Sequence, residues 1–394
     1  MASDTPSAAQ DRLLRLLTFL NHDPRNLPLL IDALTLAISV GDHACHQRLI
    51  EHITTHQIED PDACAHATHL LLQVGQYADA ATFGDKAIAG GIEHPAVLFN
   101  TALGHFYSGD YAAANTYLSL LTGNPQCPPS SLMMHARALY QLEQTEEAQA
   151  LVARALEQEP GNAEIRGLLA LLLYENDDNT QALSAAHETL AQDPDQLEAL
   201  LACATVQFEQ NNISASRKAW LHTVQKHPDC GRAWSGLAQL EFNELEFEQA
   251  EESLKKAAHY MPDHIGTWHL LAWIYILRKD SAKARQALDK SYALDRSFGE
   301  THGGLAVVDV MDGRQEQARE GIRRALKLNP TGLSAHYAQA LLLQEAGRSD
   351  EAAQLLDRVV NQTRPGSEDT GRSLIENWLK THDNNASRTR SRQH

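Results

Sequence analysis

The chain has 394 residues, of which 43% are hydrophobic and only 6% are aromatic. Its 33 basic and 51 acidic side chains give a formal net charge of −18 at pH 7, which repels nucleic-acid phosphates and anionic membrane surfaces. We therefore expect no nucleic-acid partner and no insertion into a membrane. No stretch approaches the roughly 18 apolar residues of a spanning helix, and residues 1–10 lack the pattern of a signal peptide. These features predict a soluble, cytoplasmic protein.

Residues 1–26 are expected to form an N-terminal capping helix. Leucine and phenylalanine recur with helical spacing between Ala8 and Leu20, and Pro24 follows them. A lone amphipathic helix of this kind covers the end of a stack of helix pairs. We interpret the segment as a half-repeat that precedes a repeat array.

A period of 34 residues dominates the central part of the chain, residues 27–366. One position of the period is proline in Pro160, Pro194, Pro228, Pro262 and Pro330. Arg296 stands at this position in the repeat between Pro262 and Pro330. The register defined by these prolines places ten repeat starts, with no insertion or deletion, at Leu27, Pro61, Pro95, Pro129, Ala163, Leu197, Gly231, Ile265, Gly299 and Leu333. Self-similarity at this spacing is the mark of a stacked repeat architecture.

Two columns of small residues support this register. Position 20 of the repeat is Ala or Ser in nine repeats and His46 in the first, and position 8 is Ala in eight. Two antiparallel helices approach to about 8–10 Å only where the side chains between them are small. Apolar spacing within each repeat predicts one helix over positions 1 to 14 and a second over about 16 to 29.

The period and columns of residues 27–366 resemble those of the tetratricopeptide repeat family. The repeat that begins at Gly231 matches the family pattern best, with Trp234, Leu237, Ala238 and Phe247 in the expected places. The departures are Ala where position 8 is usually Gly, and Thr68 and His46 in the first two repeats. The resemblance implies an all-α, right-handed superhelical solenoid of antiparallel helix pairs, with a concave groove where such proteins bind partners.

In this register, positions 2, 5, 9, 12 and 13 of the first helices face the groove. The residues we predict to contact a partner are Phe99, Phe106, Met133, Arg137, Tyr140, Tyr174, Phe208, Gln239, Phe242, Asn243, His269 and Trp273. Position 12 is apolar or aromatic in nine repeats. These rings either form a trough for a peptide or are half-buried between successive repeats, and the sequence leaves both interpretations open.

The C-terminal part of the chain departs from the period. Residues 367–382 carry apolar residues with helical spacing and are predicted to form a C-terminal capping helix. Residues 383–394 contain three arginines among polar residues and are predicted to be a disordered tail.

No catalytic motif, phosphate-binding loop or closed zinc-site spacing is present, so we expect neither an enzyme nor a cofactor. Two histidine pairs, His52 with His56 and His66 with His69, have spacings that could share a helix face. With 20 histidines in the chain, coincidental pairs are common, and we predict no metal site. The five cysteines have no CxxC spacing and are expected to be reduced and buried.

These observations favour a non-catalytic scaffold or adaptor that binds a peptide or protein in the groove. The charged clamp with which some family members grip an acidic C-terminus is absent, because only Asn100, Arg137 and Arg232 stand at such positions. The alternative is an accessory subunit that recruits substrates to an enzyme or to a secretion or envelope assembly machine. A self-assembling structural protein is a third interpretation, and the sequence leaves the oligomeric state open.

Overall fold

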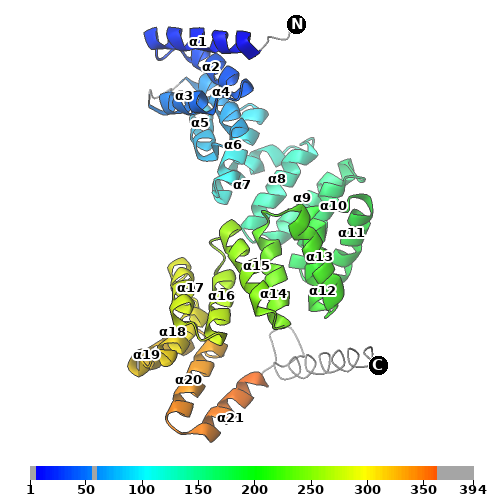
Figure 1. Cartoon of the computed structure of the whole chain (residues 1–394). Coiled ribbons are helices and arrows are strands. Elements are labelled where there is room, and N and C mark those ends of the chain that lie inside the picture. Colours follow the sequence, from blue (N-terminus) through cyan, green and yellow to red (C-terminus); the bar gives the residue numbers. More distant parts are fainter. Residues whose placement is uncertain (1–5, 56–59, 362–394) are drawn as a thin grey trace, which may run out of the picture. The chain divides into compact units, whose positions relative to one another are not determined.

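The computed structural model describes residues 6–55 and 60–361, and every regular element within these ranges is a helix (Figure 1). The expected all-α class is thereby confirmed. The predicted C-terminal capping helix and the polar tail lie outside the described residues. The chain divides into two compact units, Met1–Cys203 and Ala204–His394, and the boundary falls inside α12 (Leu197–Glu209).

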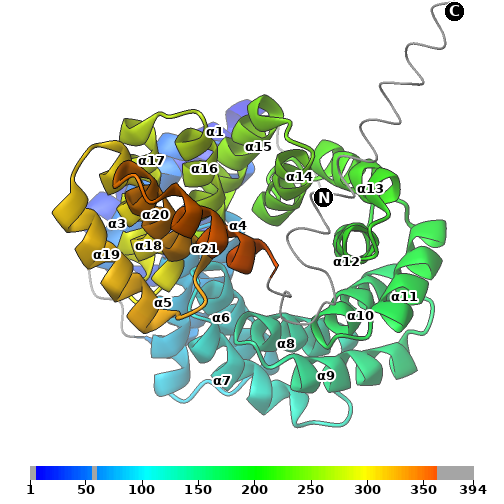
Figure 2. The ribbon, with the colours of Figure 1, turned by 90° about the horizontal axis from the view of Figure 1, so that it is seen from below.

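Unit 1 begins with α1 (Pro6–His22), which packs on the first helix of the array. Antiparallel pairs follow: α2 (Leu27–Ser39) with α3 (His43–Thr55), α4 (Pro61–Gln73) with α5 (Tyr77–Ala89), α6 (Pro95–Tyr107) with α7 (Tyr111–Thr122), α8 (Pro129–Gln141) with α9 (Thr145–Gln158), and α10 (Ala163–Glu175) with α11 (Asn179–Gln192). In Figure 2 the first helices α8 and α10 lie on the inner side of the curve of this unit, and α9 and α11 lie on its outer side.

Unit 2 continues the same alternation. After α13 (Ile213–Lys226) come α14 (Gly231–Asn243) with α15 (Phe247–Tyr260), α16 (Ile265–Leu277) with α17 (Ser281–Leu294), α18 (Gly299–Met311) with α19 (Gln315–Leu328), and α20 (Leu333–Glu345) with α21 (Ser349–Val360). In both units each first helix begins at the residue where the sequence places a repeat start.

The two columns of small residues lie where the helices of a pair touch. At position 20, Ala250 and Ala284 are fully buried, as are Ala238 and Ala272 at position 8. The Ser216 hydroxyl, which also occupies position 20, donates to the carbonyl oxygen at position 8 of its own pair at 2.8 Å. The first repeat departs from this pattern, as its sequence predicts.

The turn between the two helices of each pair has a left-handed residue at position 15. Gly41, Gly75, Gly109, Gly313 and Gly347 take this conformation at the two ends of the array, and Glu143, Asp177, Asn211, Leu245 and Lys279 take it in the middle, with φ from 58 to 62°. The motif closes through the next residue, since Glu246 donates its N–H to the Glu241 carbonyl at 2.8 Å. A left-handed residue after a helix is usually glycine, because a Cβ atom is strained there.

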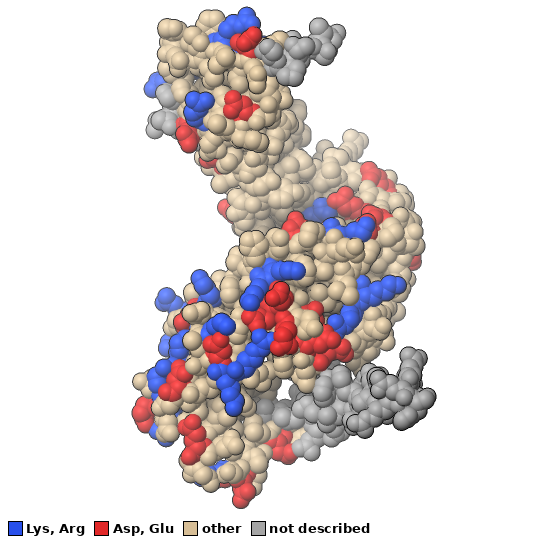
Figure 3. Space-filling model, in the orientation of Figure 1, with Lys and Arg blue, Asp and Glu red and all other residues tan. Residues whose placement is uncertain are grey.

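Charged side chains are unevenly distributed. On the face drawn in Figure 3 they are sparse over α1 to α7 and dense over α14 to α19, where acidic and basic groups alternate. Across the described part of the chain, no helix combines the length and apolar character needed to cross a bilayer.

Candidate partner-binding faces

The predicted site residues all lie on first helices, but they divide between the two units. We call positions 5, 9, 12 and 13 of α6, α8 and α10 the unit-1 face, and the same positions of α14, α16, α18 and α20 the unit-2 face. The unit-1 face holds Phe99, Phe106, Met133, Arg137, Tyr140 and Tyr174, and the unit-2 face holds Gln239, Phe242, Asn243, His269 and Trp273. Phe208 lies on α12, within unit 2, and is half-buried.

An aromatic cluster marks the start of the unit-1 face. Phe106 is half-buried and packs edge-on against Tyr107 and Tyr111, with ring centroids 5.4 and 5.3 Å away. The Tyr107 ring also packs at a tilt against Tyr77, with centroids 4.9 Å apart, yet 53% of Tyr107 remains exposed. Sequence reasoning named Phe106 and overlooked Tyr107. The sequence could have identified Tyr107, because position 13 was assigned to the groove and Asn243 was chosen as a contact from that same position.

The remaining apolar members of the unit-1 face contribute to packing. Met133 is 5% exposed and belongs to the core of α8 to α10. Tyr140 is half-buried against the same core, and its hydroxyl donates to Glu175 Oε1 at 3.1 Å. Phe99 packs beside the core of α6 to α8, and Tyr174 is half-buried. The rings of Phe99, Tyr140 and Tyr174 are therefore only partly accessible, and Met133 offers a partner almost no surface.

Arg137 joins three consecutive first helices. Its Nη2 atom donates to Glu164 Oε1 at 2.9 Å and to Glu198 Oε1 at 2.8 Å. Burial opposes the charge of the guanidinium, but attraction and hydrogen bonds from Glu198 and Glu164 raise the pKa of Arg137 above its usual value. Gln196 donates to the other oxygen of Glu198. We predicted Arg137 as a polar contact for a partner, and in the structure it binds two carboxylates of its own chain.

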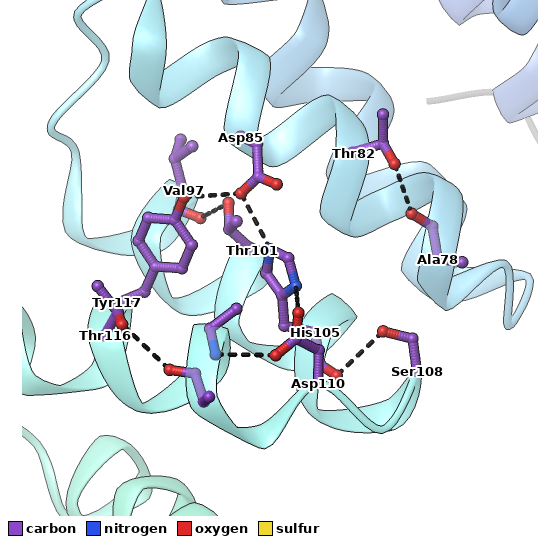
Figure 4. Close-up of polar contacts among 12 residues, drawn as sticks. Ala78, Thr82, Asp85, Val97, Thr101, His105, Ser108, Asp110, Thr116 and Tyr117 are labelled. Carbon is purple, nitrogen blue, oxygen red and sulfur yellow. Dashed lines mark hydrogen bonds and ion pairs between the residues drawn. The ribbon is translucent and has the colours of Figure 1, made fainter.

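A second polar cluster, shown in Figure 4, links α5, α6 and α7. The Asp85 carboxylate accepts hydrogen bonds from His105 Nε2 at 2.9 Å and from the Tyr117 hydroxyl at 2.7 Å. Asp110 lies on the other side of the imidazole, 3.7 Å from Nδ1. Burial and the neighbouring Asp85 raise the pKa of Tyr117 to about 12, so the phenol stays a donor at neutral pH. The cluster holds adjacent repeats together.

Aromatic rings link the first helices α16 and α20 of the unit-2 face. Trp273 packs on Tyr337, two repeats further on, with centroids 5.6 Å apart. Its Nε1 donates to His269 Nε2 at 3.0 Å, and the imidazole packs edge-on against Phe298 at 6.0 Å. Burial lowers the pKa of His269, although Glu300 opposes the shift. The histidine is therefore a neutral acceptor within this cluster.

The exposed part of the unit-2 face lies at position 13. Asn243 is exposed and accepts a hydrogen bond from Gln239 Nε2 at 3.0 Å. Leu277, one repeat further on, is 47% exposed, and sequence reasoning overlooked it as it overlooked Tyr107. Phe242 is half-buried and packs on Phe247 with centroids 5.6 Å apart.

The N-terminal histidines engage backbone and neighbouring groups. His52 Nε2 donates to the Pro24 carbonyl at 2.6 Å, and His66 Nδ1 donates to the Asp62 carbonyl at 2.7 Å. His56, the proposed companion of His52, lies outside the described residues. Within residues 6–55 and 60–361, no three His, Cys, Asp or Glu side chains are grouped so as to hold a metal ion.

Tetratricopeptide repeat models match residues 105–172, 173–240, 265–298 and 312–368, which together make up more than half of the sequence. The match over 265–298 spans the same 34 positions as the repeat that begins at Ile265. The chain belongs to the tetratricopeptide repeat family. None of the curated protein sequences compared with it matches.

Solved structures with this fold include the human IFIT1 dimer with m7Gppp-AAAA, which aligns with a TM-score of 0.53 and 14% identity over 91% of this chain and 95% of that chain. The APC/C hetero-tetramer Cut9-Hcn1 aligns with a TM-score of 0.50 and 15% identity over 90% of this chain and 77% of that chain. At such identities the likeness shows the fold alone. The repeats support a role in protein interaction, and this fold is generally non-catalytic.

Proposed function

We propose that the protein is a non-catalytic scaffold that holds a partner protein or peptide on the unit-1 and unit-2 faces. The observation that carries this proposal is the exposure of large apolar side chains at position 13, Tyr107 in unit 1 and Leu277 in unit 2. Tyr107 lies at the end of α6 and packs against the half-buried Phe106, and Leu277 lies at the end of α16.

Tyr107 has the properties of a binding anchor. Aromatic residues supply large contact areas at a small cost in conformational entropy and are enriched among the residues that dominate binding energy. Tyr77 and Phe106 already support the Tyr107 ring on two sides, so little further ordering is required when a partner arrives.

The polar groups of the faces favour an apolar or mixed partner surface over a strongly charged one. Arg137 is bound to Glu164 and Glu198, and Gln239 is bound to Asn243. A partner carboxylate would have to displace these internal carboxylates to reach the guanidinium. The net charge of −18 also favours a protein partner over a nucleic acid.

The test is capture of an endogenous partner by a double variant, Tyr107→Ala with Leu277→Ala. We expect at least a tenfold loss of captured partner with a nearly unchanged thermal melt, because both side chains are about half exposed. The matched control is Leu120→Ala with Leu221→Ala, two exposed leucines on the second helices α7 and α13. Equal losses from both double variants would contradict binding on the first-helix faces. Co-purification of a catalytic chain would identify the accessory-subunit alternative.

A further inference from the structure

The first and second helices of unit 2 differ in their basic residues. The first helices α16, α18 and α20 contain no lysine or arginine, and no position of the unit-2 face holds one. The second helices α17 and α19 together carry seven such residues, namely Lys283, Arg285, Lys290, Arg319, Arg323, Arg324 and Lys327. A cation bound on the unit-2 face would therefore meet no lysine or arginine at any position of that face.

Aromatic side chains gather in the middle of the same face. Trp273 contacts Tyr337, two repeats further on, with ring centroids 5.6 Å apart. This contact is possible because α18 and α20 approach closely at Gly303, where a Cβ atom would lie 2.6 Å from the backbone nitrogen of Ala335. Trp273 and Tyr337 are both half-buried. Their rings are thus held in place by each other, and part of each remains accessible.

A carboxylate lies beside these rings. Glu300 Oε2 accepts hydrogen bonds from the Ser334 backbone N–H at 3.0 Å and from the Ser334 hydroxyl at 2.5 Å, one turn before Tyr337 on α20. The charge of Glu300 also acts on the His269 imidazole, which accepts from Trp273. Neutral donors therefore hold the carboxylate in position and leave its charge, and within the described part of the chain no lysine or arginine forms an ion pair with it.

We propose that a partner segment on the unit-2 face places an arginine side chain on the Trp273 and Tyr337 rings, with its charge near Glu300. This inference rests on the proposed function, because it assigns one contact within the unit-2 face. The faces of aromatic rings are negative and attract cations, and a guanidinium also stacks on ring planes. An anionic group would be repelled by Glu300 and would meet no cation, and a purely apolar side chain would leave the charge of Glu300 unused.

The probe is a fluorescein-labelled peptide of sequence ALARALA, titrated with the full-length protein and followed by fluorescence anisotropy. We expect saturable binding of this peptide. The matched control replaces its arginine by citrulline, which has nearly the same shape and no charge, and should bind at least fivefold more weakly. A peptide with glutamate in place of the arginine should bind at least tenfold more weakly.

Matched variants locate the contact. Tyr337→Leu should weaken binding of ALARALA at least fivefold, whereas Tyr337→Phe keeps the ring and should bind within twofold of the parent protein. Glu300→Gln keeps an oxygen that can accept from Ser334 but removes the charge, and should weaken binding at least threefold. Glu316→Gln, on the second helix α19, should not change it. Thermal melts of the variants verify that each is folded at the temperature of the titration.

The outcomes separate this proposal from the proposed function. Equal binding of the arginine and citrulline peptides, or unchanged binding by both Tyr337→Leu and Glu300→Gln, would overturn the arginine contact. If ALARALA does not bind and the double variant Tyr107→Ala with Leu277→Ala still loses its captured partner, the arginine contact is wrong and the scaffold proposal stands. If ALARALA binding depends on Tyr337 and Glu300 as expected, the arginine contact is supported even where that double variant leaves partner capture unchanged.

Discussion

The unit-1 and unit-2 faces have the same pattern of helices, but different side-chain interactions connect their first helices. In unit 1, Arg137 joins α8, α10 and α12 through two carboxylates. In unit 2, Trp273 and Tyr337 join α16 and α20 through ring packing. Both arrangements place large or charged side chains at groove positions and use them for internal packing. The type of residue at a groove position therefore does not reveal whether its side chain is free to contact a partner, and burial within the fold has to be known as well.

The largest contrast should come from one substitution made at position 20 in each unit. Ala250→Glu places a carboxylate at a fully buried contact between α14 and α15, and we expect a loss of about 4 kcal/mol or more. His46→Glu puts the same group at the half-buried position 20 of the first repeat, where water can reach it. Hydrogen exchange should show α14 and α15 opening in the first variant and little change in the second. Equal effects would contradict the difference in packing between these repeats.

Acid should weaken unit 1 through His135, which is 7% exposed on α8. Its Nδ1 and Nε2 lie 2.7 Å from Thr122 Oγ1 and Asn115 Oδ1. Burial, together with Arg154, lowers the pKa of His135 from 6.5 to about 4. Between these pH values the unfolded chain binds the proton and the folded chain does not. The free energy of unfolding therefore decreases as the pH is lowered, by about 2–3 kcal/mol in total.

The measurement is hydrogen exchange of α8 at several pH values between 7 and 4. The variant His135→Gln keeps polar atoms at the site and removes the titration, so its protection should depend less on pH in this window. An identical pH dependence in the variant and the parent protein would show that His135 does not cause the acid sensitivity.

Salt should act on the ionic link of unit 1 and spare the aromatic link of unit 2. Arg137→Ala leaves Glu198 without its cation, and because the guanidinium is 27% exposed we expect a loss of about 1–2 kcal/mol in low salt. Trp273→Leu should cost about 1–2 kcal/mol through lost packing. The measurement is denaturant unfolding at 0.05 and 1 M NaCl. The higher salt concentration should reduce the difference in stability between Arg137→Ala and the parent protein, and it should leave the difference for Trp273→Leu unchanged. The same salt dependence in both variants would remove the distinction between the two units.

The smallest effect concerns the turn residues at position 15. Leu245 has a φ of 61°, a left-handed conformation that a Cβ atom strains. Leu245→Gly removes this strain, and we expect the free energy of unfolding to rise by about 0.5–1 kcal/mol. Asn211→Gly is the control, since asparagine tolerates this conformation and the gain should be smaller. Denaturant melts compare the two, and a loss of stability in Leu245→Gly would show that the leucine side chain contributes more than its backbone strain costs.

Much of the fold was predictable because its constraints repeat locally. The spacing from Pro160 to Pro330 and the small residues at positions 8 and 20 were enough to place the start of every first helix. The partners of long side chains were not predictable in this way. Arg137 reaches Glu198, 61 residues later, and that contact depends on how far each helix pair rotates relative to the one before it. The turn residues Glu143 and Leu245 carry no sequence signal for a left-handed conformation.

The candidate contacts were predictable in their helix and less so in their exposure. The predicted residues all lie on first helices, but Met133 is too deeply buried to offer surface. Tyr107 and Leu277 stand at a position already assigned to the groove. They were overlooked because burial depends on neighbours in adjacent repeats, and hydrophobic spacing along one helix does not report it.

Photo-crosslinking in the native cell tests the central claim most directly. Benzoylphenylalanine would replace Tyr107 or Leu277 on the first helices, and Leu120 or Leu221 on the second helices. Our account predicts that one discrete partner is linked through Tyr107 or Leu277 and is absent, or at least tenfold weaker, at the two control positions. Links to that partner from Leu120 and Leu221 alone would contradict binding on the first-helix faces.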